Sequence, residues 1–296
     1  MMSEVLRVTA LRKVVGRKTL LNQVDLTVNS GEIVGLIGPN GAGKTTFLKI
    51  ISGTARATSG TVALAKTGGI GILPESPALI SEMNALQNLQ LLASIRGKVG
   101  QQGIVDALKT VGLDPLNRKA VKYYSLGMKQ RLMLAQAIME QPQLLLLDEP
   151  TNGLDPLGII DLRQLLFKLA GQGVGIIIAS HLLNEIERMC HRVVIISQGS
   201  IFNEINLRGS TQRQVEISVS SEDDWRCLVD WAESSRVQQL PFQEHPRGLL
   251  QSQLPMPRLI AELLAAGIAI ESIQPVKASL EAAFLQCSRR EDGVYR

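Results

Sequence analysis

Aromatic residues, cysteines and long apolar runs are all scarce in this chain of 296 residues. Its three cysteines, Cys190, Cys227 and Cys287, are too few and too far apart for a disulfide framework or a CxxC metal site. No apolar run approaches the roughly 18–20 residues that span a bilayer. The N-terminal MMSEVLRV lacks the charged-then-apolar layout of a signal peptide. We therefore expect a soluble, cytoplasmic chain without a membrane span of its own.

The rest of the composition is that of a globular protein, because apolar residues make up 45% and charged residues 20%. The net charge of +4 is unevenly divided. Residues 214–296 carry 8 Lys+Arg and 12 Asp+Glu, whereas residues 1–213 carry 23 and 15. A basic first part suits an anionic ligand such as a nucleotide, or a surface near acidic lipid, and charge alone leaves both open.

Apolar runs of strand length alternate with helical patterns in the first part of the chain, which predicts an α/β fold with a parallel sheet. Expected strands cover 4–9, 23–28, 33–37, 70–73, 144–147, 174–179 and 193–197, and expected helices cover 47–51, 157–170 and 183–190. The stretch 81–141 has helical periodicity, with breaks at 97–103 and 112–115.

The pattern changes around 205–215, which predicts a second, smaller α+β domain. Its expected strands cover 215–219 and 249–254, and its expected helices cover 223–233, 258–266 and 279–286. We therefore predict a core domain at 1–211, with a helical insertion at about 76–141, and a C-terminal accessory domain at 212–296.

A glycine-rich sequence follows the predicted strand 33–37. The residues Gly38, Pro39, Asn40, Gly41, Ala42, Gly43, Lys44, Thr45 and Thr46 match the phosphate-binding pattern G-x-x-x-x-G-K-[ST]. Glycines let backbone N–H groups surround phosphate oxygens, and the helix that follows directs the positive end of its dipole at them. We expect Lys44 to reach the β- and γ-phosphates and the Thr45 hydroxyl to bind Mg²⁺.

Two adjacent carboxylates end the buried run Leu144–Leu147. Asp148 at the end of a central strand can hold Mg²⁺, and the neighbouring Glu149 can polarise the attacking water as a general base. Upstream of this strand, Ser125 opens a helix in the sequence Ser-Leu-Gly-Met-Lys-Gln-Arg, and Ser at a helix N-cap can form an anion site with Gly127 in the turn.

Together these motifs resemble the ATPase subunit of ATP-binding cassette (ABC) transporters. The matching elements are 38–46, 125–131, 144–149, 153–156 and the pair Ser180-His181, in family order over residues 4–205. The resemblance implies a P-loop NTPase core with an antiparallel β subdomain and a helical insertion, ATP and Mg²⁺ as cofactors, and ATP hydrolysis coupled to transmembrane transport.

The resemblance also implies partners. Two copies would pair head to tail, with the Ser125 turn of one copy closing over ATP on the P-loop of the other. Asp155 would lie at the seam between the copies, and His181 would contact the γ-phosphate. Separate permease chains would span the membrane, and this subunit would lie peripherally at its cytoplasmic face.

Several positions depart from the family pattern. Leu126 and Met128 replace the second and fourth residues of the usual Ser-Gly-Gly-Gln. Glu75 stands where the family usually has Gln, and we expect its carboxylate to bind Mg²⁺ or water near the nucleotide. With this Glu and the sequences SLGMKQR and DEPTNGLDP, the chain resembles the subgroup that exports bacitracin-type and lantibiotic peptides.

The tetrapeptide Gly-Leu-Asp-Pro occurs twice, at 112–115 and at 153–156. Only the second copy follows the strand that carries the paired carboxylates. We therefore predict that the first is a turn that ends a helix.

Two other functions stay open on sequence alone. A soluble cassette ATPase acting on nucleic acid or ribosomes tends to carry tandem cassettes, long coiled-coil insertions or zinc cysteines, and this sequence has none of them, so we expect no nucleic-acid partner. A regulatory nucleotide-binding module without turnover would not need Lys44, Asp148, Glu149 and His181 together.

The segment before the P-loop predicts poor selection of the base. The family commonly stacks an aromatic residue on adenine, but Val15 occupies that place and no aromatic residue precedes Phe47. Stacking on a base contributes on the order of 1–3 kcal/mol.

We therefore expect the isolated subunit to bind ATP and GTP within roughly tenfold of each other, or about 1.4 kcal/mol. Dissociation constants for both nucleotides test this, and Val15→Tyr should tighten ATP binding by around 1 kcal/mol; strong ATP preference without that gain contradicts it.

Overall fold

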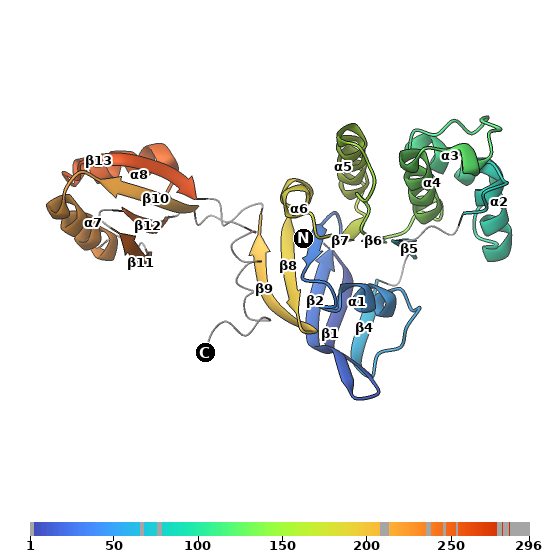
Figure 1. Cartoon of the computed structure of the whole chain (residues 1–296), viewed down its shortest axis with the longest axis horizontal. Helices are drawn as coiled ribbons and strands as arrows, with labels where there is room; N and C mark the ends of the chain where they lie inside the picture. The colour runs from blue at the N-terminus through green and yellow to red at the C-terminus, as the bar shows by residue number, and fades with distance from the viewer. Residues whose placement is uncertain are drawn as a thin grey trace. The chain divides into compact units, whose positions relative to one another are not determined.

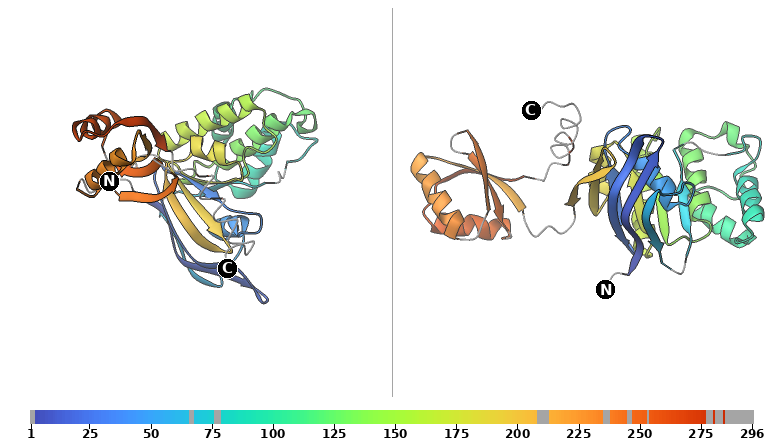
Figure 2. Two further views of the ribbon diagram at one scale, coloured as in Figure 1. Left: turned by 60° about the vertical axis from the view of Figure 1, so that its left-hand side comes forward. Right: turned by 90° about the horizontal axis from the view of Figure 1, so that it is seen from below.

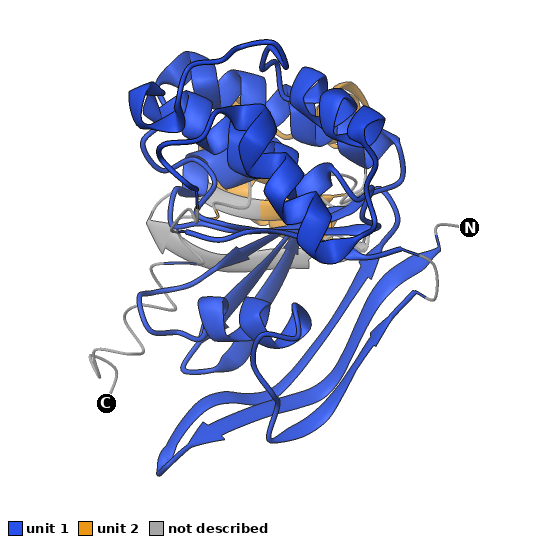
Figure 3. Cartoon of the chain, turned by 90° about the vertical axis from the view of Figure 1, so that its right-hand side faces the viewer, with its two compact units in different colours: residues 1–207, 284–296 blue, residues 208–283 orange. Residues whose placement is uncertain are grey.

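The computed structural model describes residues 3–65, 68–75, 79–207, 213–234, 238–244, 247–252 and 254–276, together with Leu280 and Phe284. The chain divides into two compact units (Figure 3), one comprising residues 1–207 with 284–296 and the other residues 208–283. All the motifs singled out in the sequence lie in the first unit.

A six-stranded sheet forms the centre of the first unit. Its strands, in spatial order, are β5 (Ile70–Leu73), β6 (Leu144–Asp148), β7 (Gly175–Ala179), β3 (Ile33–Ile37), β8 (Arg192–Ser197) and β9 (Ser200–Asn206). Neighbours from β5 to β8 are parallel, and β9 joins antiparallel at the edge. Every residue of β3, β6 and β7 is buried, as expected for central parallel strands covered on both faces.

The strand order brings distant motifs to one edge of the sheet. The P-loop follows β3, Asp148 ends β6, and Ser180 follows β7. Because β6, β7 and β3 are parallel neighbours, their carboxyl ends meet at the same edge, where open α/β sheets bind ligands. Helix α1 (Lys44–Ile51) follows β3, α5 (Pro156–Gly171) connects β6 to β7, and α6 (Leu183–Met189) connects β7 to β8 (Figure 1).

A three-stranded antiparallel sheet also belongs to the first unit and is visible in both views of Figure 2. It consists of β2 (Lys18–Asn29), β1 (Glu4–Val15) and β4 (Ser59–Leu64), in that order. β1 and β2 form a hairpin that is longer than predicted from the sequence. The sequence did not predict β4 because most of its side chains are exposed and it shows no apolar alternation.

The helical insertion contains α2 (Ala85–Arg96), α3 (Gln101–Thr110), a short 3₁₀ helix (Val121–Tyr123) and α4 (Leu126–Ile138). Asn84 begins α2 with a capping box, because its side chain accepts from the backbone N–H of Gln87 while the Gln87 side chain accepts from the backbone N–H of Asn84. The first Gly-Leu-Asp-Pro ends α3, and Gly112 adopts a left-handed φ of 73°. The prediction of a helix-ending turn is therefore confirmed.

The second unit contains a four-stranded antiparallel sheet in the order β11-β12-β10-β13. Its elements are β10 (Arg213–Val219), α7 (Glu222–Ser234), β11 (Gln238–Glu244), β12 (Arg247–Ser252), α8 (Met256–Ala265) and β13 (Ile270–Val276). This connectivity is the βαββαβ arrangement of a split βαβ fold. The core joins Val215 and Ile217 of β10 to Leu228 of α7 and Leu259 of α8.

Two strands of this unit, β11 and β13, were not predicted. Each contains a proline, Pro241 or Pro275, and a proline argues against a strand unless that strand lies at the edge of its sheet. Both are edge strands of the sheet. The predicted helix 279–286 lies outside the described residues, apart from Leu280 and Phe284.

Candidate functional site

The P-loop turns directly from β3 into α1. Gly41 and Gly43 have left-handed φ values of 84° and 111°, which residues with a side chain rarely adopt. A Cβ on Gly38 would overlap the carbonyl oxygen of Ile196 on β8. Glycine is therefore required both by the turn and by the close approach of the neighbouring strand.

Lys44 begins α1 with its ammonium group turned back into the loop. Its side chain is buried, and Nζ donates to the carbonyl oxygens of Gly38 at 2.6 Å and Pro39 at 3.1 Å. A buried cation is thus placed inside the glycine-rich loop, which suits an anionic group bound there.

Asp148 and Thr45 meet across the edge of the sheet. Asp148 as a whole residue is 9% exposed, and burial raises the pKa of its carboxyl above the ordinary value of 3.8. A hydrogen bond from Thr45 opposes this rise, the charges of Glu149 and Glu75 add to it, and the charge of Lys44 opposes it. The hydroxyl of Thr45 and the ammonium of Lys44 thus favour the ionised form of this carboxyl, and the two further carboxylates disfavour it.

Glu149 follows Asp148 in an unusual backbone conformation, with a φ of 51°. Its N–H donates to the carbonyl oxygen of Ala179 on β7 at 2.8 Å, which ties the ends of the two strands together. Glu149 Oε2 lies 2.9 Å from Nδ1 of His181, the second residue after β7. A non-glycine residue held at positive φ is a feature of functional sites, where surrounding contacts hold the strain.

Two other predicted residues lie at the margins of this group. Glu75 is exposed just after β5, close enough to Asp148 for its charge to affect that carboxyl. Val15 is 56% exposed at the end of β1, where it pairs with Lys18 across the hairpin.

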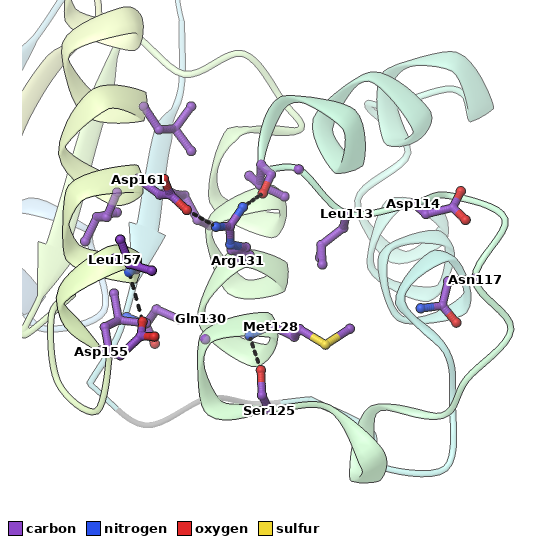
Figure 4. Close-up of a pocket in the computed structure, with 18 residues that line it drawn as sticks. Leu113, Asp114, Asn117, Ser125, Met128, Gln130, Arg131, Asp155, Leu157 and Asp161 are labelled. Carbon is purple, nitrogen blue, oxygen red and sulfur yellow. Dashed lines mark hydrogen bonds and ion pairs between the residues drawn. The ribbon is translucent and has the colours of Figure 1, made fainter.

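Ser125, Gly127 and Asp155 form a second group, which shares a cavity. They line a cavity of about 570 Å³ between α4 and α5 (Figure 4), and none of the described P-loop residues lines it. Ser125 caps α4 by accepting from the N–H of Met128 at 3.2 Å, and Asp155 caps α5 by accepting from the N–H of Gly158 at 2.9 Å. The structure therefore divides the predicted site residues into two separate groups within one chain.

Sequence reasoning assigned no role to the residues that connect this second group to its surroundings. Arg131 on α4 donates to the carbonyl oxygen of Val111 at 3.1 Å and forms an ion pair with Asp161 on α5. Gln130 donates to the carbonyl oxygen of Pro150 at 2.8 Å. Both belong to the same short motif as the Ser-x-Gly turn, 125–131, which was the available signal, but their partners are set by tertiary packing.

Comparison with known proteins decides the family. Residues 21–152 match the ABC transporter family. The chain is 34% identical to the uncharacterized ABC transporter ATP-binding protein YdbJ of Bacillus subtilis, over 99% of each chain. This chain is an ABC transporter ATP-binding subunit. As in its relatives, the cassette is an ATPase, and the family predicted from sequence is confirmed.

Named transport proteins match the cassette over much of their length. It is 40% identical to the bacitracin transport ATP-binding protein BcrA of Enterococcus faecalis, over 79% of this chain and 80% of that one. It is 38% identical to the lantibiotic transport ATP-binding protein SrtF of Streptococcus pyogenes, over 69% of this chain and 92% of that one. The resemblance to this subgroup is thus confirmed, and it favours transport over action on nucleic acid.

Solved cassettes confirm the fold class. The dimeric structure of MJ0796, a bacterial ABC transporter cassette, superposes with a TM-score of 0.62 at 26% identity, covering 69% of this chain and 99% of that one. The same cassette in a post-hydrolysis state with ADP and Pi gives a TM-score of 0.62 at 25% identity, with the same coverage. Among the described residues, no helix is both long and apolar enough to cross a bilayer.

Asp148→Asn should stabilise the nucleotide-free cassette at neutral and alkaline pH while abolishing ATP hydrolysis. Burial raises the pKa of Asp148, so the folded chain holds this proton more tightly than the unfolded chain does. The protonated Asp148 therefore contributes to the free energy of unfolding below the ordinary carboxyl pKa. This contribution is lost as the pH rises through the raised pKa of the folded chain. Denaturant titrations without Mg²⁺ should give the variant its largest advantage at pH 8 and a smaller one at pH 5.

The matched control is Asp106→Asn, because Asp106 is an exposed carboxylate on α3 and should show no such difference. A wild-type cassette that is more stable than Asp148→Asn at pH 8 would show that contacts with Thr45 and Lys44 outweigh the cost of burial.

Proposed function

We propose that this ATP-binding subunit powers the export of an antimicrobial peptide of the bacitracin or lantibiotic class. Support comes from the transport relatives, which match across the whole cassette, and from Glu75 and the Ser-Leu-Gly-Met turn, which suit that subgroup. The permease is a separate set of membrane-spanning chains, and the cassette binds peripherally at the cytoplasmic face of the membrane.

Two copies act as a head-to-tail dimer in this proposal. The observation that carries it is the division of the site, because Ser125, Gly127 and Asp155 line a cavity that the described P-loop residues do not reach. A site for ATP that uses both groups is then completed by a second copy, with Gly38–Thr46 of one chain facing Ser125 of the other. Solved dimers of a related cassette agree with a second copy as partner.

Mg²⁺ fits the oxygen ligands at the edge of the sheet. The buried Asp148 carboxylate, whose pKa burial raises, lies beside the Thr45 hydroxyl, and Glu75 is near. No group of three or more His, Cys, Asp or Glu side chains in the described part of the chain is arranged to hold a metal alone. This suits Mg²⁺, which is usually bound by one or two carboxylates together with phosphate oxygens and water. Bound there, the ion neutralises phosphate charge.

The remaining roles follow from position. Lys44 binds the phosphates, Glu149 takes a proton from the attacking water, and His181 contacts the γ-phosphate. The 2.9 Å contact between His181 and Glu149 supports this assignment, because it brings both groups together at the ends of β6 and β7. Nucleic acid has no place in this scheme.

Glu149→Gln should abolish turnover while preserving ATP binding, since it removes the base and leaves the phosphate contacts. Loss of a general base lowers the rate by roughly 10²–10⁴-fold. The ATP-bound dimer should then persist in sedimentation experiments, whereas Lys44→Ala should weaken ATP binding itself. Wild-type hydrolysis by Glu149→Gln would mean that another group is the base.

Glu75→Ala should lower transport more than it lowers the ATPase rate of the isolated subunit. Glu75 lies between β5 and the helical insertion. It can therefore transmit a change at the nucleotide to the helices that face the permease. The transport rate is measured in vesicles that contain the permease, and the ATPase rate is measured on the isolated subunit. Glu75→Gln, which restores the usual family amide, is the control and should retain coupling. Equal losses of both rates in Glu75→Ala would show that it serves only the active site.

A further inference from the structure

The start of α4 packs against the loop that leaves the catalytic carboxylates of the same chain. This loop runs from Pro150 to Asp155, between Glu149 and α5. Three residues of α4 contact it or α5, and the proposed roles of Ser125 and Glu149 do not account for these contacts.

Leu126 makes the first contact. Gly153 has a φ of 73°, and a Cβ placed on it would overlap Cδ2 of Leu126. The Leu126 side chain therefore lies directly on the backbone of the loop, although it is 53% exposed. The usual family residue here, glycine, has no side chain to make this contact.

Gln130 and Arg131 extend the connection along α4. Gln130 is 8% exposed and donates to the carbonyl oxygen of Pro150, the residue after Glu149. Arg131 is paired with Asp161 one and a half turns into α5. The N–H of Glu149 is bonded to Ala179 and the carbonyl oxygen of Pro150 to Gln130, so the backbone of Glu149 and Pro150 is held at both ends and a shift of α4 acts on one of them.

We propose that Leu126 and Gln130 are positioning residues that couple the two ATP sites of the dimer. This rests on the head-to-tail arrangement of the proposed function. There, the Ser125 turn of one copy touches ATP held by its partner, while Glu149 of that same copy acts on its own ATP. The contacts of Leu126 with Gly153 and of Gln130 with Pro150 join these two events within one chain, so ATP at one site aligns the base at the other.

The test is the cooperativity of ATP hydrolysis by the full-length subunit. The wild type should show a sigmoidal dependence of rate on ATP concentration, because energetic coupling between sites is typically 5–150-fold in affinity. Leu126→Ala should lower the Hill coefficient toward unity. A purely structural role would lower the rate or the yield of folded protein without changing the shape of this curve.

Leu116→Ala is the matched control, because Leu116 is another leucine of the helical insertion and is 84% exposed. It should retain the wild-type Hill coefficient. Gln130→Leu is the second variant, since it keeps the buried volume and removes only the donor to Pro150; it should also lose cooperativity.

Each variant is also made with Glu149→Gln and tested for dimers in the presence of ATP. The proposal is supported if Leu126→Ala and Gln130→Leu lose cooperativity of hydrolysis and still form ATP-dependent dimers when combined with Glu149→Gln. Dimers with unchanged cooperativity in both, or a hyperbolic wild type, overturn it and leave the proposed function intact. Absence of any ATP-dependent dimer in Glu149→Gln alone overturns both.

Discussion

The buried carboxylate of Asp148 is the constraint around which the nucleotide edge is arranged. A charge with so little contact with water is unfavourable unless groups of opposite charge or hydrogen-bond donors face it. Thr45 supplies a hydrogen bond and Lys44 a positive charge, but Glu149 and Glu75 add negative charge nearby. The negative charges at this edge are therefore not balanced by the protein alone, which agrees with the proposed binding of a divalent cation and phosphates there.

The parallel sheet places these groups without any local strain except at Glu149. β3, β6 and β7 are continuous apolar strands whose carboxyl ends deliver the P-loop, the carboxylates and His181 to one edge. Among Lys44, Asp148, Glu149 and His181, only Glu149 adopts a left-handed backbone, with a bond to Ala179 and a contact with His181. The loop that follows Glu149 is the one that α4 contacts.

The elements that could be predicted from sequence are those whose local pattern determines them. The apolar runs of β3, β6 and β7 and the spacing of the P-loop need no knowledge of neighbours, and the fold class and family followed from them. β4 and β9 were missed because edge strands depend on pairing more than on their own side chains. The domain boundaries and individual site roles stay predictions.

Tertiary contacts set the limit of the sequence argument. Nothing in the sequence shows that Gln130 reaches Pro150, or that Leu126 rests on Gly153, because both contacts depend on how α4 meets the loop before α5. The first Gly-Leu-Asp-Pro was correctly predicted to end a helix, yet only the structure shows that residues of both copies line the same cavity. Leu126 was recognised as a departure from the family pattern, and its contact gives that departure a physical consequence.

Complementation between two inactive copies tests the central claim, that each ATP site is built from two chains. One copy carries Lys44→Ala and the other carries Ser125→Arg, and the ATPase rate is measured separately and after mixing. In a head-to-tail dimer of the two, one site combines both defects and the other combines an intact P-loop with an intact Ser125 turn. The account predicts that the mixture regains ATP hydrolysis that neither copy shows alone. A mixture that forms dimers and stays inactive would contradict it.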